Sequence, residues 1–264
     1  LFLQSQSVFL RTTFVDDRVG RTWSSLSPKN PPEGFMRPWI VSDAGLMVAG
    51  GNSSGSFTTN VFVAPLLADG GVDEWQSVTS KLVKARGDVT LVRYADFLYA
   101  LGGRDGTFPG APGRDEVEVA RFAADGSIGT FTATKELVDP SADAASFRVF
   151  SPIVAAGAGH LFVLGGQTSS SSSSMTDVAV AAKIDETTGE LGPWLALPKL
   201  PAPINGAAAV VAGSTVLVFG GNLGSTLSDA VLALSIQADG AFGSEWKKIG
   251  TLPGPRAGLA AVVY

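Results

Sequence analysis

The chain of 264 residues repeats one pattern about every 50 residues. Each complete copy begins with an apolar run that ends in two glycines: Leu46–Gly51, Leu98–Gly103, Leu161–Gly166 and Val216–Gly221. About 25 to 29 residues after the first glycine, each copy reaches an aromatic residue: Trp75, Phe131, Trp194 and Trp246. A further aromatic, Trp23, ends a partial N-terminal copy. A repeat of this length, with four short strands in each unit, is typical of a β-propeller blade.

The last complete copy indicates how the unit folds. Residues 207–211, 216–219, 230–236 and 246–249 form short runs bounded by Gly, Asn and Ser, which predicts four strands of one antiparallel sheet. The first run is rich in Ala and Val, as suits an inner strand crowded around a central axis. The fourth run is short and more polar, which favours an outer edge.

An aspartate opens the turn before each aromatic residue: Asp17, Asp69, Asp125, Asp185 and Asp239. In three copies it is followed directly by glycine, and Asp-Gly predicts a tight hairpin turn. Because the aromatic residue recurs in every copy, we expect it to pack between blades rather than to stack on a ligand.

These elements together resemble kelch repeats. The resemblance rests on the glycine pair after an apolar strand, the third apolar run, the later Trp, and the phrase Leu252-Pro253-Gly254-Pro255-Arg256. It covers essentially the whole chain, although the Tyr that kelch units usually carry before the Trp is replaced, and the N-terminal copy has no glycine pair. The resemblance implies a β-propeller fold.

The two ends of the chain are expected to form one blade together. Residues 1–4, 7–14 and 23–26 would supply its second, third and fourth strands, and residues 259–264 its inner strand. The sequence therefore predicts a single all-β domain over residues 1–264, a propeller of five four-stranded antiparallel blades. Their approximate limits are 35–79, 86–135, 147–198, 204–250, and 1–26 with 251–264. A fragment of a six- or seven-bladed kelch propeller is the alternative.

Composition excludes several kinds of chemistry. The sequence has no Cys, one His and a net charge of −5, so we expect no disulfide, no metal site, no cofactor and no nucleic-acid partner. Kelch-like galactose oxidases need a Cys–Tyr cofactor and histidine copper ligands, so that activity is excluded. No apolar run is long enough to span a membrane. The charged fraction of only 16% favours a secreted or luminal protein.

A set of arginines forms the candidate binding site. Each stands just before an expected inner strand, and an asparagine takes the place in the remaining copy: Arg37, Arg86, Arg148, Arg256 and Asn205. If they ring one mouth of the central channel, their guanidinium groups could bind a carboxylate, sulfate or phosphate. The alternative is structural, with each arginine bonded to carbonyl groups of a neighbouring blade or paired with Asp88 or Asp143.

Three functions are compatible with these residues, since a propeller fold does not decide its function. The first is a non-catalytic binding module whose variable loops bind a protein partner or a glycan. The second is a carbohydrate-active enzyme, such as a glycosidase, a lyase or a sialic-acid mutarotase, that would use the arginine cluster. The third is a structural subunit of a larger assembly.

Overall fold

A computed structural model gives the fold of the chain. It describes residues 2–5, 8–11, 14–15, 18–19, 24–26, 32, 39–42, 45–53, 55–69, 71–105, 112–169 and 174–263. Strands make up nearly all of the regular structure in this part of the chain, which also contains the short 3-10 helix η1 (Pro140–Ala142). Among these residues, no helix has the length and apolarity needed to cross a membrane.

Four antiparallel sheets of four strands form the body of the molecule. Sheet 1 contains β6 (Trp39–Ser42), β7 (Gly45–Ala49), β10 (Asn60–Ala64) and β11 (Gln76–Lys81). Sheet 2 contains β12 (Thr90–Tyr94), β13 (Phe97–Leu101), β14 (Val117–Arg121) and β15 (Thr132–Ala133). Sheet 3 contains β18 (Ile153–Gly157), β19 (His160–Leu164), β20 (Ala179–Ile184) and β21 (Leu191–Ala196). Sheet 4 contains β22 (Ala208–Ala212), β23 (Thr215–Phe219), β24 (Ala230–Ser235) and β25 (Lys247–Thr251).

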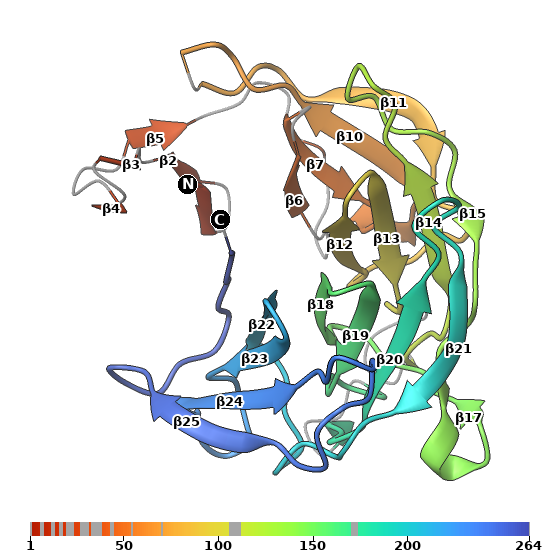
Figure 1. The fold of residues 1–264 in the computed structure, drawn as a ribbon. Coiled ribbons are helices and arrows are strands. Elements are labelled where there is room, and N and C mark those ends of the chain that lie inside the picture. The colour runs from red at the N-terminus through yellow and green to blue at the C-terminus, as the bar shows by residue number, and fades with distance from the viewer. Residues whose placement is uncertain are drawn as a thin grey trace.

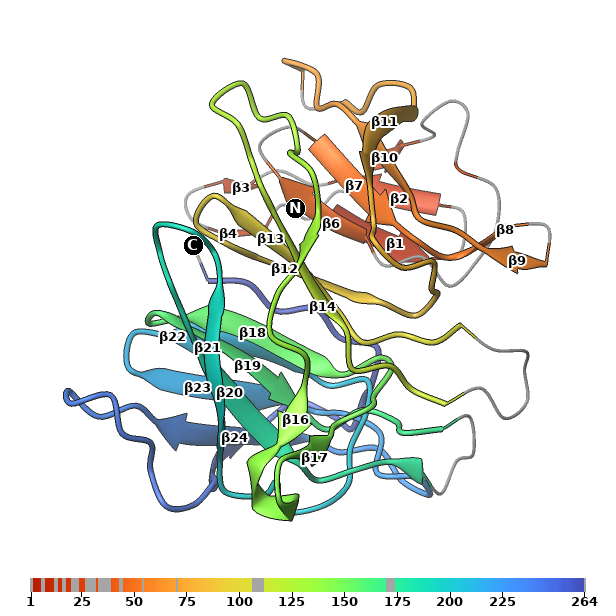
Figure 2. The ribbon, with the colours of Figure 1, turned by 90° about the vertical axis from the view of Figure 1, so that its right-hand side faces the viewer.

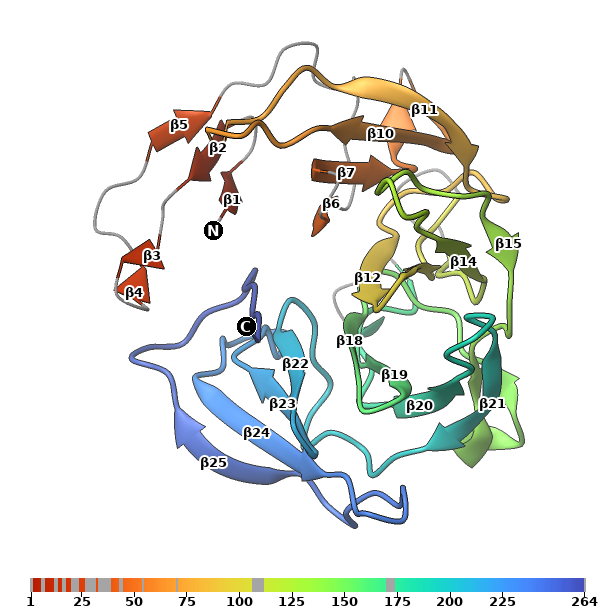
Figure 3. The same cartoon turned by 45° about the horizontal axis from the view of Figure 1, so that its top comes forward.

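The sheets are arranged around a central axis, with the first strand of each nearest the axis and the last strand outermost (Figure 1, Figure 3). The inner strands are neighbours, since β12 contacts both β6 and β18, and β18 contacts β22. Short hairpins are added to this frame: β8 (Asn52–Ser53) with β9 (Ser56–Phe57), and β16 (Val138–Asp139) with β17 (Ala145–Ser146). The β8–β9 hairpin extends from one side of the molecule (Figure 2).

The glycine pairs join each sheet to the unit that follows. The second glycine of each pair donates its N–H to a carbonyl of the next unit: Gly51 to Arg86 (2.9 Å), Gly103 to Val149 (3.0 Å), Gly166 to Ile204 (2.8 Å) and Gly221 to Arg256 (2.8 Å). The first glycines have φ between 55° and 65°. A Cβ built on them would lie 2.3–2.6 Å from the same carbonyl oxygens. Only glycine allows this conformation and this approach.

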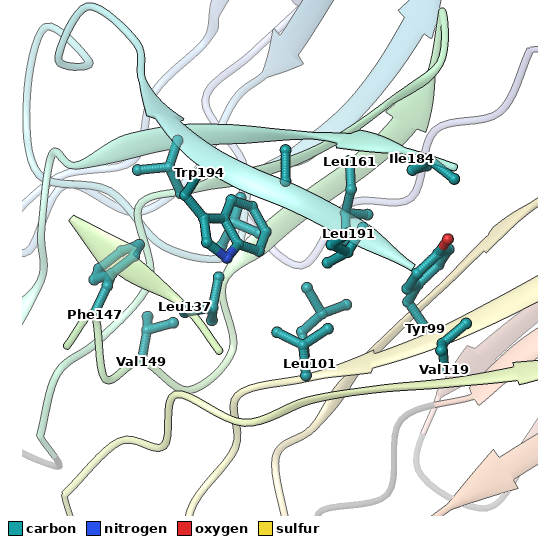
Figure 4. Packing of buried hydrophobic residues seen from close by; sticks show 14 of the residues in the cluster. Tyr99, Leu101, Val119, Leu137, Phe147, Val149, Leu161, Ile184, Leu191 and Trp194 are labelled. Atoms are coloured by element: carbon teal, nitrogen blue, oxygen red, sulfur yellow. The ribbon is translucent and has the colours of Figure 1, made fainter. Parts of the chain in front are cut away.

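The apolar core is divided into clusters between neighbouring sheets. Trp194 of sheet 3 belongs to one buried cluster with Tyr99 and Leu101 of sheet 2 (Figure 4). Likewise, Phe131 of sheet 2 packs against residues of sheet 1, and Trp246 of sheet 4 against residues of sheet 3. For these three residues the expectation that the repeated aromatics pack between units is confirmed. Trp75 clusters with Leu46, Val48 and Ala64 of its own sheet. The side chains of the N-terminal sheet lie outside the described residues, as does Trp23.

The repeated aspartates stabilise the hairpin turns. The side-chain oxygen of each accepts a backbone N–H two residues later: Asp69 from Gly71 (2.7 Å), Asp125 from Ser127 (2.9 Å), Asp185 from Thr187 (2.8 Å) and Asp239 from Ala241 (3.0 Å). This is the Asx turn, in which the side chain replaces a backbone acceptor. The recurring aspartate is therefore part of the architecture.

The N-terminal region forms a separate three-stranded sheet of β1 (Phe2–Ser5), β2 (Val8–Arg11) and β5 (Ser24–Leu26). These strands lie close to the positions expected from the sequence. The hairpin of β3 (Phe14–Val15) and β4 (Arg18–Val19), which comes between them, was not predicted. Residues 259–263 form no strand, contrary to expectation, and no described strand pairs with them.

Candidate functional site

One side of the molecule, here called the loop face, carries the segments that follow the glycine pairs and the connections between successive sheets. The residue after each glycine pair is polar: Asn52, Arg104, Gln167 and Asn222. The last three form backbone bridges with the segment that leads into the first strand of their own sheet, here called the entrance of the sheet. The bridged entrance residues are Gly87, Phe150 and Asn205. The backbone support is thus the same in these sheets, while the side chain that it presents changes.

Arg86 lies inside the protein and not at an open mouth. Its side chain has no exposed surface and forms a buried ion pair with Glu118 of β14, at 2.8 Å between Nη1 and Oε1. Nη2 also donates to the carbonyl of Ala100 at 3.2 Å. Burial lowers the pKa of Arg86 below its ordinary value, against the opposing effect of the Glu118 charge. The guanidinium therefore stabilises sheet 2.

Glu118 connects this ion pair to the chain that enters sheet 2. Its Oε2 accepts the backbone N–H of Val83 at 2.8 Å, and Oε1 accepts that of Lys84 at 3.0 Å. The carboxylate is almost completely buried and binds three donors. Buried charges are tolerated when they are paired and hydrogen-bonded in this way.

The other sequence-predicted residues are separate from Arg86. Arg148 is exposed and lies 3.6 Å from Asp115. Arg256 is also exposed, and its Nε donates to the carbonyl of Gly254 at 3.0 Å. Asn205 is half-buried at its backbone bridge, and Arg37 lies outside the described residues. Within the described residues, no hydrogen bond or ion pair joins two members of this set.

The hydrogen bonds also correct the alignment of the repeats. The carbonyl that receives the glycine N–H belongs to Arg86, Val149, Ile204 and Arg256, so Val149 and not Arg148 is the counterpart of Arg86 in sheet 3. An arginine occupies this position in two of the four described units. The acceptor is a backbone oxygen, which any residue supplies, and the side chain at this position is therefore free to vary.

Sequence reasoning did not identify a cluster formed by Arg104, Asp88 and Phe150. Arg104 Nε donates to Asp88 Oδ2 at 2.6 Å, and its guanidinium carbon lies 5.1 Å from the centre of the Phe150 ring. Arg104 is 6% exposed. The cluster joins the entrances of sheets 2 and 3 on the loop face. The available signal was the position of Arg104 directly after a glycine pair.

A second group of charges lies beside it. Arg114 forms a two-pronged ion pair with Glu116 and also contacts Asp105 at 3.0 Å. The hydrogen bond that Arg114 donates to Glu116 raises the pKa of Arg114. Burial alone would raise the pKa of Glu116, but its bonds and charge interactions with Arg114 and Arg86 lower it. Both groups therefore remain charged at neutral pH.

Two surface hollows lie away from the loop face. The first has a volume of about 280 Å³ and is lined mainly by Phe97, Arg121 and four threonines: Thr130, Thr132, Thr187 and Thr188. The second, of about 510 Å³, lies on the outer strands of sheet 4 and is lined by residues that include Ser235, Glu245 and Lys247. Within the described residues, no group of three Asp, Glu or His side chains is arranged to hold a metal ion.

Comparisons with known proteins support the fold and not a function. No known family and no curated protein matches the sequence. Among solved structures, the chain is similar to one described as the structure of YjhT, which has a kelch-type β-propeller fold. The TM-score is 0.69 at 13% sequence identity, and the alignment covers 96% of this chain and 80% of the other. Together with the four antiparallel sheets, this likeness fits a β-propeller-type fold.

Proposed function

We propose that the protein is a non-catalytic interaction module that binds a protein partner through its loop face. The observation that carries the proposal is the repeated backbone bridge described above, which holds three different polar residues, Arg104, Gln167 and Asn222, in sheets 2, 3 and 4. Binding residues are commonly found on variable loops held by a rigid scaffold. The loop face combines these two properties.

The side chains exposed on this face favour a protein partner over a glycan. Val83 and Leu227 are large aliphatic residues that are 49% and 47% exposed. Arg148 and Arg256 are exposed on the same side. Apolar contacts together with arginine are typical of protein–protein interfaces. We therefore propose that these four residues contact the partner.

The proposed architecture places this face on a closed ring. We propose that the sheets are kelch-type blades of a single domain, and that the N-terminal sheet with residues 251–264 completes a fifth blade. One observation supports this arrangement: Gly221 donates to the carbonyl of Arg256 as the other glycine pairs do to the next sheet. Residues 252–258 thus have the contacts of an entrance to a further blade.

Peptide selection tests the function. Random linear peptides displayed on phage would be selected on the immobilised protein, and their binding would be compared with that to a Val83→Asp/Leu227→Asp variant. A matched control, Leu195→Asp/Ile249→Asp, places the same charges on exposed residues of the outer strands. We expect the selected peptides to lose binding to the loop-face variant and to retain it with the control.

Other outcomes would contradict the proposal. Peptides that bind both variants equally, or no enrichment at all, would show that the loop face does not bind proteins in this way. A glycan array provides a parallel measurement with the same two variants. A glycan whose binding is lost only in the loop-face variant, in the absence of peptide binding, would replace the protein partner with a sugar.

A further inference from the structure

The entrances of the inner strands share an unusual backbone conformation. Two residues after each carbonyl that accepts the glycine N–H, the chain has a positive φ: Asp88 (51°), Ser151 (47°), Gly206 (60°) and Gly258 (70°). The backbone N–H of Ser151 donates to the carbonyl of Asp88 at 3.3 Å, and that of Gly258 to Gly206 at 2.8 Å. These positions are therefore structurally equivalent and lie around the mouth of the central axis on the loop face.

At this positive-φ position, sheets 2 and 3 have residues with side chains, whereas the later units have glycine. Glycine adopts a left-handed conformation without steric cost, and the chain uses it at Gly206 and Gly258. Asp88 and Ser151 adopt the same conformation at a cost. Sparsely populated backbone conformations of this kind are often found where a side chain is needed for binding. The question is what these two side chains can bind.

The charge of Asp88 is already compensated. Its Oδ2 accepts from Arg104 Nε at 2.6 Å, and the Phe150 ring covers the guanidinium. Arg104 is therefore directed at a carboxylate and not at solvent, which disfavours an external anion. Asp88 Oδ1 and Ser151 Oγ have no protein hydrogen-bond partner within the described part of the chain. The Asp88 side chain is 20% exposed, and Ser151 is exposed.

We propose that Asp88 Oδ1 and Ser151 Oγ form a subsite for an uncharged hydrogen-bond donor of the partner protein, such as a hydroxyl or a carboxamide N–H. This inference rests on the function proposed above and specifies its chemistry. Because Arg104 neutralises Asp88, the free carboxylate oxygen needs a donor but not a cation. The Ser151 hydroxyl, which both donates and accepts, suits the side chains of Ser, Thr, Asn and Gln.

The test uses peptides selected from the phage library that depend on the loop face. We expect them to be rich in Ser, Thr, Asn or Gln. Ser151→Ala removes the hydroxyl and keeps the backbone cost, so it should weaken binding about tenfold with little change in Tm. Ser151→Gly removes both, so it should weaken binding equally while raising Tm by about 2–4 °C. Asp88→Asn presents an amide where the partner meets a carboxylate oxygen, and should also weaken binding about tenfold.

The outcomes separate this inference from the broader proposal. If peptides depend on Val83 and Leu227 but bind the Ser151 and Asp88 variants with unchanged affinity, the subsite is wrong and the interaction module remains. Selected peptides that are dominated by Asp and Glu would also overturn the donor chemistry. Peptides that bind the Val83→Asp/Leu227→Asp variant with unchanged affinity would overturn the proposed function and the subsite together. Near-UV circular dichroism of Asp88→Asn verifies that its loss of binding is not a loss of folding.

Discussion

Two kinds of residue contact stabilise this chain, and they can be tested separately. The glycine pairs allow close backbone approach between sheets, and the Arg86–Glu118 pair fixes the entrance to sheet 2. The first depends on the absence of a side chain, and the second on two charges that are buried together. Substitutions should therefore act by different mechanisms at the two places.

Gly102→Ala should lower the free energy of unfolding by about 2–4 kcal/mol. The new Cβ would lie 2.3 Å from the carbonyl oxygen of Val149, at a residue with φ of 58°. Gly213→Ala is the matched control, because Gly213 has φ of 56° and nothing within 4 Å of the added atom. The Gly213→Ala variant should lose only about 1 kcal/mol of its free energy of unfolding. Equal losses in urea unfolding would mean that the close approach contributes nothing.

Glu118→Ala should lower the free energy of unfolding by about 3–5 kcal/mol, because it leaves a buried guanidinium without its partner. An Arg86→Met/Glu118→Leu double variant removes both charges and should recover part of that loss. Urea unfolding of both variants measures the difference. If the double variant is as unstable as the single one, the role of Glu118 would instead be to accept the N–H groups of Val83 and Lys84.

At the scale of the element, the hairpin turns make stability depend on pH. The side-chain hydrogen bond from Ser127 lowers the pKa of Asp125, and the backbone N–H of Thr187 lowers that of Asp185, both from an ordinary value of 3.8. A carboxyl group whose pKa is lower in the folded state than in the unfolded state stabilises the folded state when it is ionised. This stabilisation is complete at pH values above the pKa of the unfolded state, and it is lost as the pH falls through the pKa of the folded state.

We expect an Asp125→Asn/Asp185→Asn variant to lose less stability in acid than the natural chain. Unfolding free energies of the two proteins should differ most at neutral pH and converge as the pH falls from about 5 to about 2. Asp143→Asn serves as a control outside the hairpin turns. A constant difference between the two proteins at every pH would contradict the role of these carboxylates.

At the scale of the whole molecule, the proposed closure of the ring by both ends of the chain can be tested with a disulfide. The test is simple because the sequence has no natural cysteine. A Gln4→Cys/Ala261→Cys variant should form an intramolecular disulfide on oxidation if residues 259–263 pair with β1 in one blade. A Gln4→Cys/Ala241→Cys variant is the control. Gel mobility under non-reducing conditions reports the crosslink. If neither pair forms a disulfide, or both do so equally, the five-bladed ring is wrong.

Much of the fold could be predicted from the sequence because it repeats. Four copies of one pattern predict the strands of sheets 1 to 4, and a recurring aromatic residue predicts packing between them. The Arg104–Asp88 contact could not be predicted, since it occurs once and depends on how two entrances are brought together. The sequence also could not show that Val149, rather than Arg148, is the counterpart of Arg86. The contact is made by the backbone oxygen of Val149, which does not depend on its side chain.

The link between successive sheets consists of a glycine N–H and a carbonyl oxygen, and neither atom carries side-chain identity. Any unit that ends its second strand in two glycines can therefore be joined to any unit that offers a free carbonyl at its entrance. Gene duplication could add or remove such a unit without inventing a new joint. The number of units would then be limited by the side chains packed between neighbouring sheets, because their size sets the angle between one sheet and the next.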